Sequence, residues 1–225
     1  PAGASSFIVR IATINDGVIE GNETITVSAA TPQNATAVIG TGTITDGAVP
    51  TISLSGAPEV NEAAGTVTYT VSLSAASAAS VSVNYGTANG SATAGSDYTA
   101  TSGSVTFAPG ETSKTFTVAI ANDTVYEGAE TYTVNLSGAT NATIATGTVT
   151  TTIRDDGTGT GGTNDDRLTV TSVSSPTVGE GGNLDFTVNL SGTSTTATTV
   201  TVTPSSGTAT LGTDTGTQQY STDGG

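Results

Sequence analysis

Short runs in which apolar residues alternate with threonine or serine recur along most of this chain. In the segment 66–74 the apolar positions are Val67, Tyr69, Val71 and Leu73. A period of two is typical of a half-buried β-strand, and threonine favours strands because it is β-branched. We find no stretch with the 3.6-residue apolar spacing of an amphipathic helix. The sequence therefore predicts an all-β chain.

Seven such runs lie between Thr51 and Arg154. Turn-forming pairs separate them, such as Asn89–Gly90 and Pro109–Gly110. Seven short strands with regular turns over about 100 residues predict an antiparallel β-sandwich. The long apolar runs of a parallel sheet are missing, which argues against an α/β enzyme fold.

Internal similarity divides the chain into units. Residues 15–20, Asn-Asp-Gly-Val-Ile-Glu, match residues 122–127, Asn-Asp-Thr-Val-Tyr-Glu. Residues 60–62, Val-Asn-Glu, match residues 178–180, Val-Gly-Glu. The matches predict the C-terminal half of one repeat at 1–47, a complete repeat at 48–157, a glycine-rich linker at 158–167, and the N-terminal half of another repeat at 168–225.

Neither end piece can close a sandwich by itself, because an open sheet exposes its apolar face and its unpaired edges. Two interpretations are open. Either the chain is cut from a longer array of repeats, or the front half of one chain docks with the back half of another in a head-to-tail filament. We expect the glycine-rich linker 158–167 to behave as a flexible coil.

Composition excludes several classes of function. Acidic residues outnumber basic ones by 19 to 4, and the formal net charge of −15 repels nucleic acids and anionic membrane surfaces. No stretch approaches the roughly 20 apolar residues that span a bilayer. Histidine and cysteine are absent, so the usual nucleophile–base pairs and zinc sites cannot form. We expect no enzyme activity, no catalytic or cofactor-binding residues, no nucleic-acid partner and no membrane insertion.

The acidic residues of the complete repeat gather at strand ends and in loops. They are Glu62, Asp97, Asp123, Glu127, Glu130, Asp155 and Asp156. Hard cations such as calcium take six to eight oxygen ligands, largely from loop carboxylates. Lys114 and Arg154 cannot neutralise so many acids, so the spacing favours a metal site, although a solvated acidic rim stays open. Glu130 is equally a ligand or a partner of a neighbouring strand, and we interpret Asp165 and Asp166 as solvated linker residues.

Several segments of the complete repeat resemble the Calx-beta domain in order and spacing. They are Val60-Asn-Glu62, Tyr85-Gly-Thr-Ala, Ser96-Asp97-Tyr98, residues 103–110, residues 120–130 and Ile153-Arg-Asp155-Asp156. The resemblance covers 51–157 and implies tandem immunoglobulin-like antiparallel β-sandwiches of about seven strands each, as in large bacterial surface proteins and adhesins. It also implies calcium at one end of the sandwich. Carried over position by position, the implied ligands are Glu62, Asp97, Asp123, Glu127, Asp155 and Asp156.

Two departures from the family pattern imply a weaker site. Asn122 stands where strong binders have a further aspartate, and Gly157 ends the closing acidic run early. In the flanking halves the corresponding acids form partial sets. They are Asp16, Glu20 and Asp46 on one side, and Glu180 and Asp214 on the other.

The hypothesis that follows is a structural or adhesive repeat region of a secreted or cell-surface protein. It would form a calcium-stiffened rod or filament, whose partners are calcium ions and neighbouring repeats or head-to-tail copies. The alternative is a calcium-dependent glycan- or protein-binding module of a larger extracellular protein. In that case Tyr98 and Tyr126, beside the acidic loops, are the candidate sugar contacts, although we favour core or rim positions for both tyrosines.

Overall fold

The computed structural model describes residues 5–14, 18–34, 36–45, 49–205, 207–209, 212 and 215–216. The chain divides into two units, Pro1–Thr195 and Thr196–Gly225. Among the described residues the sole helix is a three-residue 3₁₀ turn, Glu62–Ala64, and none is long and apolar enough to cross a membrane. The prediction of an all-β chain is confirmed.

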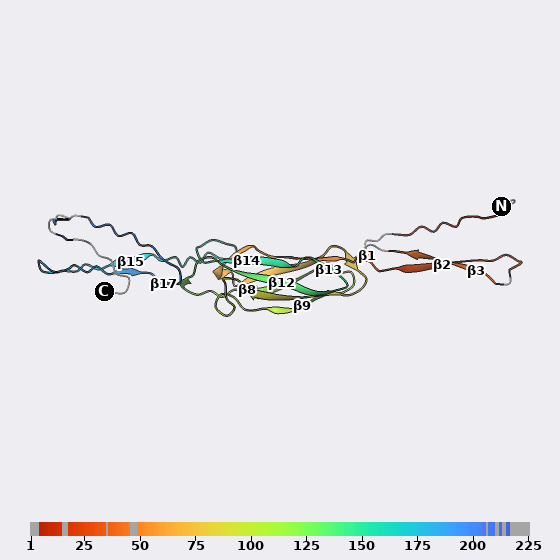
Figure 1. Cartoon of the computed structure of the whole chain (residues 1–225), viewed down its shortest axis with the longest axis horizontal. Coiled ribbons are helices and arrows are strands. Elements are labelled where there is room, and N and C mark those ends of the chain that lie inside the picture. Colours follow the sequence, from red (N-terminus) through yellow and green to blue (C-terminus); the bar gives the residue numbers. More distant parts are fainter. Residues whose placement is uncertain are drawn as a thin grey trace. The chain divides into compact units, whose positions relative to one another are not determined.

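Nine strands between residues 51 and 154 build a two-layer sandwich (Figure 1). They are β4 (Thr51–Ser55), β5 (Glu59–Asn61), β6 (Thr66–Leu73), β8 (Val81–Asn89), β9 (Ser102–Phe107), β10 (Ser113–Ala119), β12 (Glu130–Thr140), β13 (Thr143–Thr146) and β14 (Thr148–Arg154). One sheet has the order β10–β6–β4–β13, and the other has the order β5–β14–β12–β8–β9. All seven predicted strands form. The short strands β5 and β13 were not predicted, and both pair in parallel, with β14 and β4 respectively.

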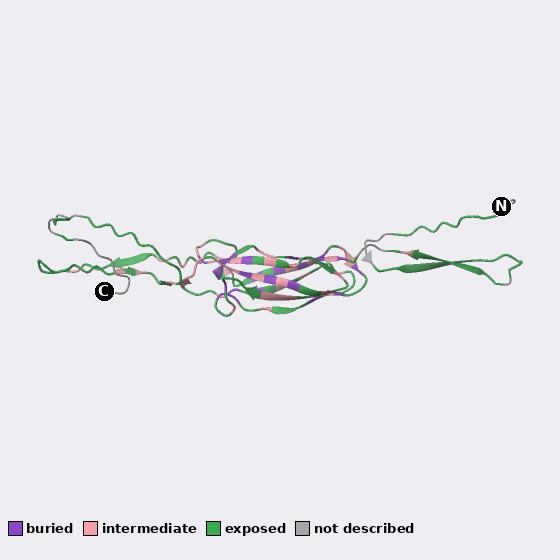
Figure 2. Ribbon diagram, in the orientation of Figure 1, coloured by how far each residue is buried: buried purple, intermediate pink, exposed green. Residues whose placement is uncertain are grey.

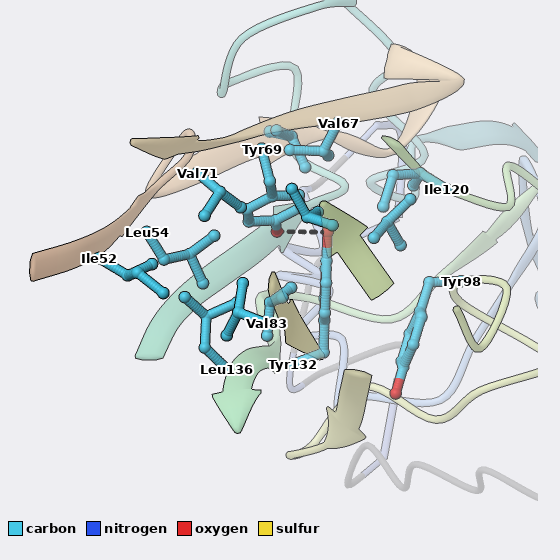
Figure 3. Packing of buried hydrophobic residues seen from close by; sticks show 14 of the residues in the cluster. Ile52, Leu54, Val67, Tyr69, Val71, Val83, Tyr98, Ile120, Tyr132 and Leu136 are labelled. Atoms are coloured by element: carbon cyan, nitrogen blue, oxygen red, sulfur yellow. Dashed lines mark hydrogen bonds between the residues drawn. The ribbon is translucent and has the colours of Figure 1, made fainter. Parts of the chain in front are cut away.

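The alternating apolar side chains of the two sheets face each other and form the core (Figure 3). A buried hydroxyl network joins the layers: the Tyr69 hydroxyl of β6 donates to the Tyr132 hydroxyl of β12 at 2.9 Å. The same Tyr69 oxygen lies 2.6 Å from Oγ1 of Thr151 in β14. A buried hydroxyl left without a partner costs about 1–3 kcal/mol, so this network lets tyrosines occupy the core. Gly56 packs on Tyr69, where an added Cβ would lie 2.4 Å from the ring.

The N-terminal strands repeat the register of the complete sandwich. In the pair β2 (Glu23–Ala29) and β3 (Val38–Ile44), Glu23 faces Ile44. At the equivalent place in β12 and β14, Glu130 faces Ile153. The apolar side chains of this pair are exposed, however (Figure 2): Ile25 is 38% exposed, whereas core residues of β12 are fully buried. This pair therefore has the strand geometry of the repeat with its apolar face uncovered.

The strands after the complete sandwich also repeat its register and leave their apolar side chains exposed. In the pair β15 (Val170–Val173) and β16 (Val188–Leu190), Val170 faces Leu190, just as Ile52 of β4 faces Leu73 of β6. Apolar side chains here are also exposed, Phe186 by 60%. Figure 2 shows that buried residues gather in the central sandwich, so the core of the described chain lies there.

Candidate metal centre

Parallel pairing of two strands brings the first acidic residues together. Asp155 directly follows β14, and Glu62 directly follows β5 at the start of the 3₁₀ turn. Because β5 and β14 run in parallel, with Asn61 facing Arg154, their C-terminal ends meet at the same edge. The Asn61 side chain caps the turn by accepting a hydrogen bond from the Ala63 amide at 3.0 Å. This local geometry holds the Glu62 and Asp155 carboxylates side by side.

The first carboxylate cluster consists of Glu62, Asp155 and Asp166, with one oxygen of each within 4.8 Å of the others. Glu62 is 7% exposed and Asp155 is 3% exposed. One buried oxygen of each, Oε2 of Glu62 and Oδ1 of Asp155, has no hydrogen-bond partner while both carboxylates are ionised, and a proton on one would bond it to the other. Each of the other oxygens accepts a backbone amide: the Asp123 amide donates to Glu62 at 2.8 Å, and the Glu127 amide donates to Asp155 at 3.0 Å.

The second cluster consists of Asp97, Glu127 and Glu130, again with oxygens within 4.8 Å of one another. Asp97 is buried, and its Oδ2 accepts the Thr93 amide at 2.5 Å. Glu130 is the first residue of β12, where it faces Ile153 of β14, and one of its carboxylate oxygens lies in this cluster.

Asp123 lies between the two clusters. Burial is the main cause that raises the pKa of Glu62 and of Glu127, and the charge of Asp123 adds a smaller contribution to both. The Oδ1 atom of Asp123 accepts the Val125 amide at 2.7 Å. Asp156 takes a different position. Its Oδ1 accepts hydrogen bonds from the amide and hydroxyl of Thr158, which lowers its pKa, and it belongs to neither cluster.

Burial and mutual repulsion dominate the electrostatics of the clusters. Burial raises the pKa of Glu62 to about 7, opposed by the hydrogen bond from the Asp123 amide and reinforced by the charge of Asp155. Burial also raises the pKa of Glu130 to about 7, with a further contribution from the charge of Asp97. The three ion pairs of the described chain lie elsewhere: Lys114–Glu111, Arg154–Glu59 and Arg167–Asp165. The carboxylates therefore lack protein cations to balance them, as predicted for Lys114 and Arg154.

A sequence profile of the Calx-beta domain matches residues 1–52 and 46–157. The chain belongs to the Calx-beta domain family. Human sodium/calcium exchanger 3 is 49% identical over 55 residues, which cover 24% of this chain and 6% of the exchanger. Sodium/calcium exchanger 1 of Canis lupus familiaris is 47% identical over 57 residues, covering 25% and 6%. The chain thus spans about 6% of the length of these relatives.

Calx domains are among the solved structures that are similar to the chain. The apo-form Calx CBD1 domain has a TM-score of 0.46 and 26% identity, covering 48% of this chain and 98% of that chain. The calcium-binding domain CBD12 of CALX1.1 has a TM-score of 0.43 and 23% identity, covering 53% and 50%.

The glycine-rich segment after the Calx-beta repeat is packed against the repeat, and our expectation of a flexible coil for 158–167 is wrong. Asn61 is fully buried, and its Nδ2 donates to the carbonyls of Thr158 at 3.1 Å and Asn164 at 2.9 Å. Its Oδ1 accepts the Asn164 amide at 3.0 Å. Gly159, with φ of +90°, approaches so closely that an added Cβ would lie 2.6 Å from the Asn61 nitrogen. Glycine here permits close packing.

Because the glycine-rich segment is packed against the repeat, our interpretation of Asp166 as a solvated linker residue is wrong. Asp166 joins the first cluster, where its Oδ2 accepts Nδ2 of Asn164 at 2.5 Å. The same Asn164 nitrogen donates to Asn122 at 3.1 Å. Asp165 keeps the predicted solvent-facing role and pairs with Arg167. A local sequence pattern could not reveal Asp166, because Asn61 positions it from about a hundred residues away.

The tyrosines proposed as sugar contacts differ in exposure. Tyr98 is 1% exposed, stacks on Tyr132 at 4.5 Å between ring centroids, and donates its hydroxyl to Asn89 at 2.6 Å. It is a core residue, so it cannot offer a ring face to a glycan. Tyr126 is half-buried in the short strand β11 (Val125–Tyr126). Of the acids predicted in the flanking halves, Asp16, Asp46 and Asp214 lie outside the described residues, and Glu20 and Glu180 are exposed.

The raised pKa values predict how the metal-free protein responds to pH. Glu62 and Glu130 bind protons more tightly in the folded state, so their contribution to stability is present below about pH 4.5 and is lost as the pH rises through about 7. In chelator we therefore expect the unfolding temperature to fall between pH 5 and pH 8. The chain has no histidine to titrate in this range. Calorimetry that finds the chelated protein more stable at pH 8 than at pH 5 would contradict the burial of these carboxylates.

Proposed function

We propose that this Calx-beta chain is a calcium-binding structural repeat region. The observation that carries the proposal is the first cluster, where Oε2 of Glu62 and Oδ1 of Asp155 are buried, unpartnered and close to Asp166. Burying a carboxylate oxygen without a partner is unfavourable by several kcal/mol, unless a proton or a cation neutralises it. Above the raised pKa of Glu62, about 7, a cation is the neutralising partner that remains. A bound cation would relieve this strain and the raised pKa values together.

The donor set fits a hard divalent cation. All candidate ligands are carboxylate oxygens, and calcium takes six to eight oxygens in flexible geometry, whereas magnesium demands an octahedron and keeps several waters. The two clusters with Asp123 between them supply seven carboxylates. They are Glu62, Asp155, Asp166, Asp97, Glu127, Glu130 and Asp123. The names of the curated relatives, sodium/calcium exchangers, support calcium over other ions.

The structural or adhesive part of the proposal rests on repetition. The strand registers of the complete repeat recur on both sides of it, and the residue types of common catalytic pairs are absent from the sequence. We infer a repeat array outside the cell, where modules of this type bind calcium at about 10⁻⁴–10⁻³ M, and no enzyme activity. The burial of Tyr98 removes one support of the glycan-binding alternative.

Thermal unfolding of the whole chain tests the proposal. With dissociation constants of about 10⁻⁴–10⁻³ M, 10 mM calcium stabilises the fold by roughly 1.4–2.7 kcal/mol. We expect the unfolding temperature to rise by several degrees in calcium, and by much less in magnesium. The double variant Asp123→Asn with Glu127→Gln should lose most of this rise.

A matched double variant removes the same charges away from both clusters. Asp185→Asn with Glu111→Gln alters an exposed residue of the half-repeat at 168–225 and the partner of Lys114. It should keep the full calcium response. If the unmodified chain has the same unfolding temperature in chelator and in calcium, the clusters bind no calcium under these conditions. The proposed function would then have to be revised to a metal-free repeat.

A further inference from the structure

Among the described residues one kind of strand pairing occurs twice, each time between two consecutive repeats. The short strand β1 (Val18–Ile19) pairs in parallel with β7 (Ala76–Ser77) of the complete repeat. The short strand β11 of the complete repeat pairs in parallel with β17 (Thr193–Ser194) of the following half-repeat. All four strands lie within the unit Pro1–Thr195. A pairing that recurs at two places is a property of the repeat.

The paired positions are equivalent in the repeat. Val18 follows the Asn-Asp pair at 15–16 as Val125 follows the Asn-Asp pair at 122–123. Ala76 stands three residues after Leu73, and Thr193 stands three residues after Leu190, at the ends of matching strands. The residue types differ between the two junctions. β1 is Val-Ile where β11 is Val-Tyr, and β7 is Ala-Ser where β17 is Thr-Ser. Main-chain pairing of strand edges tolerates such differences, because the backbone supplies the hydrogen bonds.

At the second junction two further hydrogen bonds converge on one carbonyl. The Ser194 hydroxyl donates to the carbonyl of Tyr126 at 2.7 Å, and the Thr195 amide donates to the same oxygen at 3.1 Å. Residues 193–195 of the following half-repeat thus pair with or donate hydrogen bonds to residues 125–126 of the complete repeat. Serine occupies the second position of both receiving strands, at 77 and 194.

The segment that carries β11 also touches the carboxylate clusters. Residues 123–127 begin with the Asp123 amide bonded to Glu62 and end with the Glu127 amide bonded to Asp155. Between these two anchors, the Tyr126 carbonyl is bonded to the following repeat. One five-residue segment therefore contacts the acidic site on one side and the next repeat on the other.

We infer that the parallel pairing of Val125–Tyr126 with Thr193–Ser194 is a main-chain joint between consecutive repeats, and that Val18–Ile19 and Ala76–Ser77 form the same joint one repeat earlier. The partner at each junction is the next repeat of the same chain, recognised through its strand edge. The joint itself is independent of any ion. Its tightening by calcium, through the anchors of segment 123–127, rests on the proposed function.

Cysteine pairs test the joint in the whole chain, which has no cysteine of its own. Neighbouring strands lie about 4.8 Å apart, within the Cα separations of about 4.4–6.8 Å that disulfides bridge. Val125→Cys with Thr193→Cys should form an intramolecular disulfide in dilute oxidised monomer. The matched pair Val125→Cys with Thr187→Cys, six residues out of register, should form roughly tenfold less, because its effective concentration is lower. Peptide mapping by mass spectrometry measures both yields.

The first junction provides a second, independent test. Val18→Cys with Ala76→Cys should also form a disulfide, and equal, low yields at both junctions and in the out-of-register pair would overturn the joint. Repeating the measurement in calcium and in chelator separates the two proposals. A preferential disulfide with no calcium effect on yield or unfolding supports the joint and contradicts the calcium function. A calcium-dependent unfolding temperature without a preferential disulfide leaves the calcium function standing and overturns the joint.

Discussion

Replacing Asp155 with asparagine is expected to raise the unfolding temperature in chelator and to remove most of the stabilisation by calcium. The Asp155 carboxylate is 3% exposed, and burial raises its pKa. An asparagine oxygen can still accept the Glu127 amide, which now lies 3.0 Å from Asp155. The new amide group can donate to the Glu62 or Asp166 carboxylate, so repulsion becomes attraction. The same change deletes a charged candidate ligand, so under the proposed function calcium affinity should fall by at least about tenfold.

The opposite signs in chelator and in calcium are what distinguish this result from general destabilisation. Thermal unfolding under both conditions, with calcium titration by calorimetry, measures them. Asp156→Asn is an informative comparison, because the family resemblance makes Asp156 a ligand whereas its carboxylate bonds to Thr158. We expect Asp156→Asn to keep most of the calcium response. If Asp155→Asn instead lowers the unfolding temperature in chelator and leaves the calcium response intact, the first cluster is not the ion site.

Replacing Asn61 with alanine should destabilise the repeat and release the segment 158–166. The buried Asn61 side chain makes four hydrogen bonds, to Ala63, Thr158 and, twice, Asn164. Each buried polar group that loses its partner costs about 1–3 kcal/mol, and some of the freed groups will reach water. We expect a loss of roughly 2–4 kcal/mol, or about 10 °C or more in the unfolding temperature of a domain of this size.

Chemical denaturation and amide hydrogen exchange measure the two parts of this prediction. In the unmodified chain the amides of Gly157 and Asn164 are bonded and should be protected, and Asn61→Ala should expose them to exchange. Asn135→Ala is a suitable control, because the hydrogen bonds of the Asn135 side chain go to the hydroxyls of Thr133 and Thr148 on the protein surface. Its loss should stay below about 1 kcal/mol. Rapid exchange at Gly157 and Asn164 in the unmodified chain would instead support a free coil.

Asn61 and Asn164 connect the first carboxylate cluster, the candidate ion site, with the chain that follows the repeat. Asn61 holds Asn164, which in turn bonds to Asp166 of the first cluster. The proposed joint at Tyr126 lies within the segment 123–127, whose end amides bond to Glu62 and Asp155. Calcium bound at the clusters would therefore act on both connections between one repeat and the next, the docked segment and the strand joint. This is a physical route by which binding could stiffen an array.

The strands and the core were predictable because period-two alternation is local. Val67, Tyr69 and Val71 alternate with threonines, and the same three side chains are buried. The acids at strand ends were equally visible as a group. Glycine content misled the interpretation of 158–167, since glycine permits flexibility in a free chain and close approach in a packed one. Only the contact between Gly159 and the Asn61 backbone distinguishes these cases.

The sequence by itself determined that this chain is all-β, built from a repeated sandwich, and that its acidic residues gather at strand ends. These properties follow from patterns within a few residues and from matches between segments. The tertiary structure decided which carboxylates share a site. Glu62 meets Asp155 because β5 and β14 pair in parallel, and Asp166 joins them because Asn61 holds the glycine-rich segment. Such contacts depend on strand ends that are about a hundred residues apart in the chain, and local sequence carries no record of that proximity.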